Sequence, residues 1–400
     1  MSLKRFPLIC ASVIAIVATC SVESSPYDVA LSSYSPVTPL REVRALWIVR
    51  DSIKTTESIR AIVESMRRNK FNTAIVQVRG RGDAYYRSEF VPVAAGIAPG
   101  LDPLAEFIRV AKPYGISVHA WINVFLGADR ESLRAATKNH LAFAHRDWFL
   151  RDRSGRSMLT YSAREMRAAD VEGAFLDPSN QDVRRYNVQV VHELLSKYPV
   201  DGIHLDYIRY PSSQTGTPFD FGINSLLPTD PRKAPDILAM RKARAENVTQ
   251  MVSEIREEIR RTGPSRILSA AVWPNKMKVE ERVFQMWPEW LRSRLIDYAF
   301  LMAYYDTETL HDQRVSQFFD PEINNRMIIG VGIYKNPAPK VALHQLTSAR
   351  AMGAAGICYF HAEWFLSKNA IEKEKKYQLP EVFDTWKDPG FTPARTSSIP

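Results

Sequence analysis

Short apolar segments alternate with longer amphipathic segments from residue 43 onward. Eight apolar segments have the length and composition of strands, and the segments between them repeat apolar residues at helical spacing. Strands that alternate with helices indicate βαβ units and a parallel sheet. Eight such units favour a closed (β/α)8 TIM barrel over an open sheet. The expected strands are 43–49, 73–78, 116–122, 202–206, 267–272, 298–304, 327–333 and 356–360, with helices at 56–70, 103–112, 181–197, 241–261 and 341–351.

The alternation inside the strands predicts which side chains face the barrel axis. In the third strand, apolar residues alternate with His119, Trp121 and Asn123. Successive side chains of a strand point to opposite faces, so these three residues are expected to point inward. The same alternation turns His204 and Asp206 inward in the fourth strand. Polar groups at the carboxyl ends of barrel strands are what a catalytic face requires.

Two long connections, residues 124–175 and 208–235, follow the third and fourth strands. Both are far longer than an ordinary loop in an α/β unit. Long loops at the carboxyl side of a barrel commonly build the substrate site. We therefore expect both segments to wall a groove at this face of a single domain.

The N-terminus has the pattern of a signal peptide. Lys4 and Arg5 precede a short apolar run, which ends in Val-Ala-Thr-Cys at Cys20. The run is too short to span a membrane, which needs about 20 residues. The four residues resemble a bacterial lipobox, and lipidation of Cys20 and ordinary cleavage near the same place stay open as alternatives. Either one predicts export to the periplasm or cell envelope, with a lipid anchor in the first case.

This interpretation divides the chain into four segments. Residues 1–20 form the signal peptide, and residues 21–40, rich in Ser and Pro, form a tether. Residues 41–368 form the barrel. Residues 369–400 form a C-terminal strap and tail.

Composition narrows the class of partner and cofactor. The chain has 400 residues, 45% of them hydrophobic, and a net charge of +9. Its basic residues are spread among acidic ones and form no block with interleaved aromatics, which argues against nucleic acid as a partner. The histidines lack a clustered metal-ligand spacing, and no Gly-rich loop precedes a helix, so we expect no metal and no other cofactor. Of three cysteines, Cys358 lies in an apolar run and is expected to pack in the core.

Several motifs resemble one family of barrel glycosidases. The run from Val200 to Pro211 reads VDGIHLDYIRYP, and it resembles the fourth strand of the glycosyl hydrolase-like ten family. The segments 77–86, 100–104, 118–123 and 175–184 match other motifs of that family in the same order. The resemblance extends from about residue 42 to about residue 365. It implies a TIM barrel that cleaves glycans.

Asp206 is the central candidate for catalysis. It ends an apolar strand inside the expected barrel, where a carboxylate is costly without partners. Arg79, Arg209 or His204 are placed to hold it ionised. An ionised Asp206 could attack the anomeric carbon, stabilise an oxocarbenium ion or orient an N-acetyl group, and all three roles need its negative charge. The alternative is an Asp that pairs with an Arg to close the top of the barrel.

Glycoside cleavage commonly needs a second carboxyl group. The candidates are Asp306, Glu363 and Asp83, with loop caps and surface ion pairs as the alternative interpretation. Residues 302–306 read MAYYD and are similar to the Met-x-Tyr-Asp motif of family-eighteen chitinases, which contacts the sugar N-acetyl group. Ile208 stands where those chitinases have their general-acid Glu, so their full mechanism does not carry over.

Aromatic and polar side chains near strand ends complete the candidate site. Aromatic faces stack on sugar rings, although core packing explains any single one of them equally well. The candidates for substrate binding are Arg79, His119, Trp121, Asn123, His204, Arg209, Trp273 and Tyr304.

The sequence thus favours a glycosidase that acts on a cell-envelope glycan, with peptidoglycan strands lacking stem peptides as one substrate. Two alternatives stay open. One is a glycan-binding envelope lipoprotein that keeps the barrel without catalysis, and the other is a hydrolase of an external polysaccharide. A second carboxyl group close to Asp206 across an open cleft separates the enzyme from the binding protein.

The N-terminal pattern makes a prediction about location. Replacing Cys20 by Ala removes the lipidation site, so a lipidated protein is expected to move from the membrane fraction to the soluble fraction. Fractionation and immunoblotting of cells that express each form measure this. Unchanged membrane association of Cys20→Ala would contradict lipidation.

Overall fold

The computed structural model describes residues 42–377, with gaps at residues 135, 153, 213–235, 336 and 367–368. In the described chain, eight parallel strands close into a barrel in the order β1-β2-β3-β6-β7-β8-β9-β10. All eight expected strands are confirmed, with ends that differ by at most three residues. They are β1 (Val43–Ile48), β2 (Thr73–Arg79), β3 (Ser117–Asn123), β6 (Gly202–Asp206), β7 (Ile267–Val272), β8 (Tyr298–Leu301), β9 (Met327–Val331) and β10 (Gly356–Phe360).

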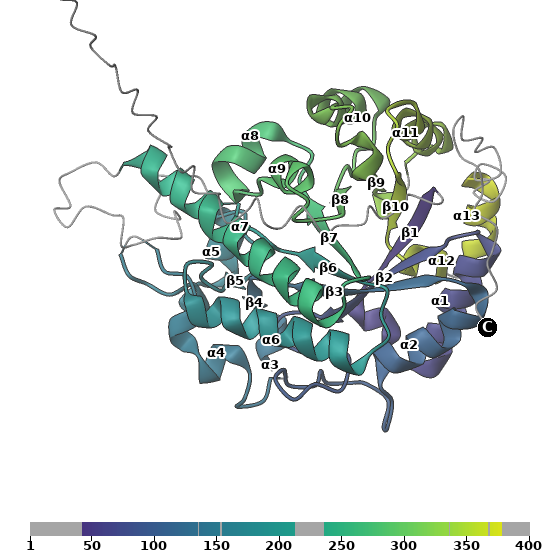
Figure 1. Ribbon diagram of the computed structural model, residues 1–400. Helices are drawn as coiled ribbons and strands as arrows, with labels where there is room; N and C mark the ends of the chain where they lie inside the picture. Colours follow the sequence, from purple (N-terminus) through teal and green to yellow (C-terminus); the bar gives the residue numbers. More distant parts are fainter. Residues whose placement is uncertain are drawn as a thin grey trace, which may run out of the picture. The chain divides into compact units, whose positions relative to one another are not determined.

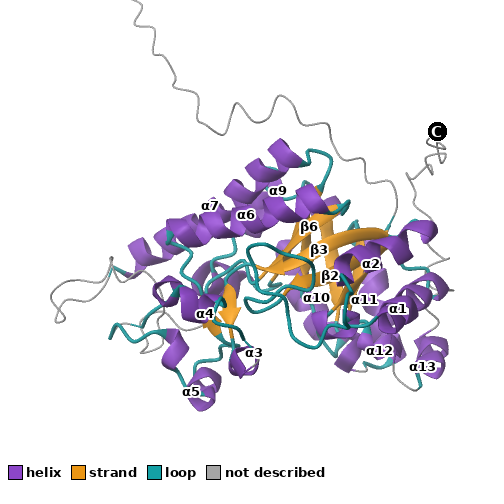
Figure 2. Ribbon diagram, turned by 90° about the horizontal axis from the view of Figure 1, so that it is seen from below, coloured by secondary structure: helices purple, strands orange, loops and turns teal. Residues whose placement is uncertain are grey.

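Helices surround the barrel on the outside, as Figures 1 and 2 show. Side-chain caps fix where several of them begin: Asp102 accepts a hydrogen bond from the Ala105 amide, and Asn180 accepts one from the Asp182 amide. The helices between barrel strands are α1 (Thr56–Arg68), α2 (Pro103–Ala111), α6 (Gln181–Lys197), α7 (Ile237–Thr262), α8 (Lys276–Lys278), α9 (Trp287–Arg292), α10 (Glu308–Val315) and α11 (Pro339–Ala351), and after β10 come α12 (Glu363–Leu366) and α13 (Ala370–Tyr377).

The connection between β3 and β6 carries its own small structure. An antiparallel pair of strands, β4 (Leu126–Ala128) and β5 (Ala174–Phe175), brings the two ends of the segment 124–175 together. Three short helices, α3 (Arg130–Arg134), α4 (Leu141–Ala144) and α5 (Ala163–Ala168), gather beside this pair (Figure 2). The sequence pattern predicted a long connection here but did not resolve these elements, because each is too short to show a period.

The barrel interior is filled by aromatic side chains that need room. Trp47 on β1 is 1% exposed and lies against Gly330 on β9, where an added Cβ would stand 3.0 Å from the indole ring. A glycine at this position therefore makes space for Trp47. Trp47 donates from Nε1 to Nε2 of His204 at 3.2 Å. Since Nε2 accepts, Nδ1 carries the ring proton and donates to the Ser269 hydroxyl at 2.9 Å.

Outward side chains confirm the period-two interpretation of the strands. Ile203 and Leu205 on β6 are fully buried in the apolar layer between barrel and helices, whereas Trp121 packs in the separate cluster inside the barrel. Cys358 is buried in that inner cluster as a free thiol, as expected. Burial raises the pKa of this thiol well above its usual range, so it stays protonated and inert.

The expectations for the chain ends fall largely outside the described residues. The signal peptide and the tether lie there, as does most of the 208–235 connection. Residues 370–377, placed at the start of the strap, form helix α13, and the Tyr377 ring lies 5.2 Å from the Trp364 ring. In the described part of the chain, no helix combines the length and apolar character needed to cross a membrane.

Candidate active site

A cavity of about 370 Å3 opens at the carboxyl ends of the barrel strands. Strands β1, β2, β3, β6 and β10 contribute side chains to it, and so does the β3–β6 connection. This position is where TIM-barrel enzymes bind their substrates. The cavity therefore defines the candidate active site, and it confirms that the connection of residues 124–175 helps to wall the carboxyl face.

Asp206 lies in this cavity at the last position of β6, partly exposed. Its Oδ1 accepts a hydrogen bond from the Tyr207 amide at 2.7 Å. Tyr207 has a φ of 49°, in the left-handed region that costs a non-glycine residue about 1 kcal/mol or more. The chain turns sharply here, so the strand ends with its carboxylate directed at the cavity.

Burial raises the pKa of Asp206 to about 6. The nearby negative charge of Glu172 raises it further, whereas the Tyr207 amide, the Arg209 guanidinium and the Trp121 indole oppose the rise. Burial has the largest effect on the pKa, because an ionised carboxylate loses more hydration in an apolar site than its few polar contacts return. Asp206 thus gains and loses its proton near neutral pH.

Glu172 is a second carboxyl group in the same cavity. It precedes β5 in the β3–β6 connection, and its Oε1 lies 2.7 Å from the guanidinium of Arg209. The Arg209 side chain is 4% exposed and stacks over the rings of Tyr207 at 4.8 Å and Phe175 at 5.3 Å. A cation held in this way keeps a negative charge beside it in place.

A hydrogen-bonded network of side-chain amides and one indole lines the cavity beside Asp206. The Oδ1 atom of Asn123 accepts hydrogen bonds from Trp121 Nε1 at 3.1 Å and from Gln77 Nε2 at 3.3 Å. The Oε1 of Gln77 in turn accepts from the Arg50 amide at 3.2 Å. Because all four side chains line the cavity, this network holds polar groups in fixed orientations toward a substrate.

Aromatic rings form the remaining walls. Tyr304 and Phe360 are stacked, with ring centroids 5.3 Å apart, and Trp47 meets Tyr304 edge-on at 5.9 Å. Trp273 also lines the cavity, and the Lys278 ammonium lies 3.5 Å from the centroid of its ring. Aromatic walls with a few convergent polar groups are typical of sites that bind sugar rings.

Residues 42–345 match the family model described as Glycosyl hydrolase-like 10. The chain belongs to this family. The match covers most of the barrel and includes every strand except β10.

Two relatives and one solved structure are similar to this family member. The glycosyl hydrolase DigH of Escherichia coli is 24% identical over 315 residues, which cover 69% of this chain and 65% of DigH. The glycosyl hydrolase YngK of Bacillus subtilis is 23% identical over 250 residues, covering 56% of this chain and 43% of YngK. The chain thus spans less than two thirds of these relatives. The glycoside hydrolase domain of PgaB from Bordetella bronchiseptica shares the fold, with a TM-score of 0.62 and 14% identity over 86% of this chain and 99% of that domain.

Within this glycosyl hydrolase-like barrel, five of the predicted binding residues line the cavity around Asp206. They are Trp121, Asn123, Arg209, Trp273 and Tyr304. For Trp121 and Asn123 this expectation rested on strand alternation. The parallel register places both residues beside the fourth strand, where Asn123 pairs with Asp206 and Trp121 pairs with His204.

Three other predicted binding residues lie elsewhere. His119 and His204 point into the barrel but are buried below the cavity, and burial holds the pKa of His119 at about 4 and that of His204 well below its usual range. Arg79 leaves the barrel interior because a β-bulge after Gln77 shifts the register. Its guanidinium binds the Asn123 carbonyl and the Asn187 side chain instead.

The three predicted acids are not in the cavity of Asp206. Asp306 and Glu363 are exposed, and Glu363 accepts a hydrogen bond from the Ser52 hydroxyl at 3.1 Å. Asp83 lines a neighbouring cavity of about 280 Å3, which shares Arg50 with the first.

Sequence reasoning missed Glu172, Gln77, Arg50 and Arg81. Gln77 carried a usable signal, because it alternates with outward apolar residues in the second strand. Glu172 carried none, since only the pairing of β4 with β5 brings its segment back to the barrel mouth.

Burial of Asp206 predicts a pH-dependent stability difference. Below about pH 4, Asp206 is protonated in the folded and the unfolded chain, and above about pH 6 it is ionised in both. The cost of burying the charge therefore develops as pH rises between these values. Asp206→Asn removes the cost of burying this charge. The substitution should stabilise the fold by at most about 3 kcal/mol near neutral pH, and by almost nothing near pH 4.

Urea unfolding at both pH values measures this difference. The matched control is Asp306→Asn, which makes the same change from carboxylate to amide at an exposed position. An Asp206→Asn protein that is no more stable than the wild type at neutral pH would show that the carboxylate is well compensated.

Proposed function

We propose that this protein hydrolyses glycosidic bonds of a cell-envelope glycan, with Asp206 as its central carboxyl group. The observation that carries the proposal is the presence of Asp206 and Glu172 in one open, aromatic-lined cavity at the catalytic end of a glycosyl hydrolase-like barrel. A glycosidase needs two carboxyl groups on either side of the scissile bond, one able to give a proton and one ionised. A binding protein that had lost catalysis would not need to keep this pair.

The two environments support different roles for the two groups. Asp206 lies against apolar and aromatic side chains with its pKa raised to about 6, which suits a group that donates a proton to the leaving glycosidic oxygen. Glu172 pairs with Arg209 and suits the ionised role, in which a negative charge stabilises positive charge that develops at the anomeric carbon. This assignment differs from the sequence expectation of an ionised Asp206, and the difference rests on burial.

The lining residues support a glycan with acidic substituents. Arg50 and Arg81 line the cavity in addition to Arg209, and Arg81 forms an ion pair with Asp129 at its rim. Arginine binds carboxylates with two parallel hydrogen bonds. Peptidoglycan strands without stem peptides carry a free carboxylate on every second sugar, so they match this lining better than a neutral glycan does.

The envelope location rests on the N-terminal pattern of Lys4, Arg5 and Cys20 together with this substrate class. An exported hydrolase would meet its glycan without crossing a membrane again. A hydrolase of an external polysaccharide would use the same site, and the substrate panel below separates the two.

The first test removes the acid. Asp206→Asn keeps the shape of the side chain and its bond from the Tyr207 amide, but it cannot donate the proton. We expect kcat on denuded peptidoglycan strands to fall on the order of a thousandfold, with little change in KM. Tyr304→Phe should cost far less, since it removes one hydroxyl group.

Purified wild-type protein is assayed in parallel on denuded strands, chitin oligomers and α-glucans, with products resolved by mass spectrometry. Near-full activity of Asp206→Asn on any cleaved substrate would contradict the catalytic assignment. Cleavage of a neutral glycan alone would contradict the envelope substrate.

The second test uses the pH profile of kcat/KM, which reports groups of the free enzyme. If Asp206 donates a proton, the protonated form is active, and kcat/KM falls as pH rises through about 6. The residual activity of Asp206→Asn should lack this descending limb. An ascending limb near pH 6 in the wild type would instead assign Asp206 the ionised role.

A further inference from the structure

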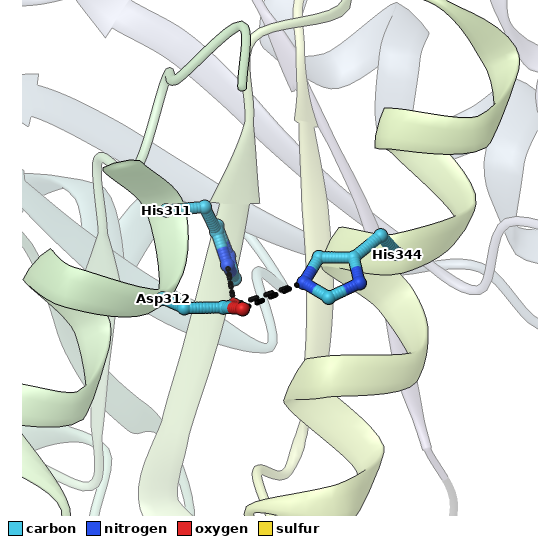
Figure 3. A group of neighbouring side chains, drawn as sticks. All are labelled: His311, Asp312 and His344. Carbon is cyan, nitrogen blue, oxygen red and sulfur yellow. Dashed lines mark hydrogen bonds and ion pairs between the residues drawn. The ribbon is translucent and has the colours of Figure 1, made fainter. Parts of the chain in front are cut away.

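A cluster of two histidines and one aspartate lies outside the barrel, away from the proposed active site. His311 and Asp312 belong to α10, and His344 belongs to α11 (Figure 3). Each residue offers one ligand atom, and these atoms lie within 4.8 Å of one another. Helices α10 and α11 follow consecutive barrel strands, so the cluster forms only when the two helices pack.

Both imidazoles converge on the same carboxylate. Nε2 of His344 lies 2.9 Å from Oδ2 and 3.0 Å from Oδ1 of Asp312, and Nδ1 of His311 lies 3.1 Å from Oδ1. In Figure 3 the three side chains point toward one another from two helices. An ordinary surface ion pair of this kind joins one histidine to one carboxylate, and such pairs contribute little to stability. Here a second imidazole reaches the same carboxylate, and metal sites commonly bring three or more ligand groups together in this way.

The distances fit a small transition metal. Ligand atoms about 2.0 to 2.2 Å from a tetrahedral zinc ion stand roughly 3.3 to 3.5 Å apart. The imidazole–carboxylate contacts of 2.9 to 3.1 Å need only a slight outward movement to reach that spacing, and the ligand nitrogens of the two imidazoles lie within 4.8 Å of each other. Asp312 and His344 are partly exposed, which leaves an approach from solvent for the ion and for water in a fourth position.

The burial of His311 adds a second indication. Its side chain is fully buried, so its ring orientation is set by packing and not by the carboxylate alone. Neutral imidazole nitrogens together with a carboxylate oxygen suit Zn2+ and its neighbours in the transition series, whereas Mg2+ and Ca2+ prefer oxygen ligands alone.

We propose that His311, Asp312 and His344 bind a divalent transition-metal ion of the zinc class, which clamps α10 to α11. The histidine spacing along the chain does not indicate this site, because the third ligand lies on a separate helix. The clamp lies next to a contact with the active-site segment: Gln345, the residue after His344, donates from Nε2 to the Tyr305 carbonyl at 2.8 Å. The ion therefore braces the segment that carries Tyr304 into the cavity.

The test is metal binding by full-length protein that carries no affinity tag and has been stripped with a chelator. A titration with Zn2+ that is monitored by calorimetry is expected to show one equivalent of Zn2+ bound per chain. Zn2+ should also raise the melting temperature by several degrees, and the chelator should reverse the shift. Co2+ in place of Zn2+ should give the visible absorption of a tetrahedral site, and Mg2+ should give no saturable binding.

Two variants and a matched control locate the site. His344→Ala and Asp312→Asn each remove a partly exposed ligand and should weaken Zn2+ binding by roughly a hundredfold or more. His192→Ala is the control, because His192 is an exposed histidine 2.8 Å from the carboxylate of Glu258 and belongs to no group of three possible ligands among the described residues. It should bind Zn2+ like the wild type. Circular dichroism establishes that each variant is folded.

Wild-type protein that shows no saturable Zn2+ binding would overturn the proposal. Unchanged affinity in both His344→Ala and Asp312→Asn would also overturn it, as would loss of binding in His192→Ala. None of these measurements depends on glycan hydrolysis.

Discussion

The cost of removing the Asp206 carboxylate from water is the constraint on which the candidate site depends. The carboxyl group lies at the end of a buried strand, and its burial outweighs the polar contacts that it receives. A fold under selection for stability alone would place an apolar residue at this position. The barrel instead keeps the group and opposes its ionisation only in part, which leaves its proton exchangeable near neutral pH.

Arg209 is the cation that stabilises negative charge on the carboxyl groups of the cavity. It is nearly fully buried, it balances Glu172 directly, and it lowers the pKa of Asp206 at longer range. Its guanidinium lies among the rings of Tyr207, Phe175 and Trp273, which shield it from water while they leave its charge intact. One buried cation thus acts on two carboxyl groups unequally, because it contacts Glu172 directly and affects Asp206 only at longer range.

The sequence predicts those parts of the molecule that depend on local pattern. Apolar runs and strand alternation are properties of neighbouring residues. The runs located all eight strands, and the alternation turned Trp121, Asn123 and Asp206 toward one cavity. Arg79 departs from its expected place because a single extra residue in β2 reverses the side of every later side chain in that strand. A bulge leaves no mark in a hydrophobic pattern.

Glu172 shows the other limit of local reasoning. It lies in a connection of about fifty residues, and its place at the barrel mouth is set by two residues of β5 that pair with β4. Along the sequence, its partner Arg209 comes after helix α6 and strand β6. A contact between such distant segments has no periodicity, so only the closed barrel reveals it. The same holds for His344 beside Asp312, where two helices meet because the strands before them are neighbours in the sheet.

The backbone at Tyr207 connects these features. A non-glycine residue in the left-handed region persists only where surrounding contacts offset its cost. Here the turn places the Tyr207 amide on Asp206 Oδ1 and the Tyr207 ring over Arg209, so one strained residue orients both the Asp206 carboxyl group and the Arg209 guanidinium. Glycine would relieve the strain but would lose the ring that packs on the guanidinium. The geometry of the site therefore follows from a local backbone cost that the surrounding aromatic packing offsets.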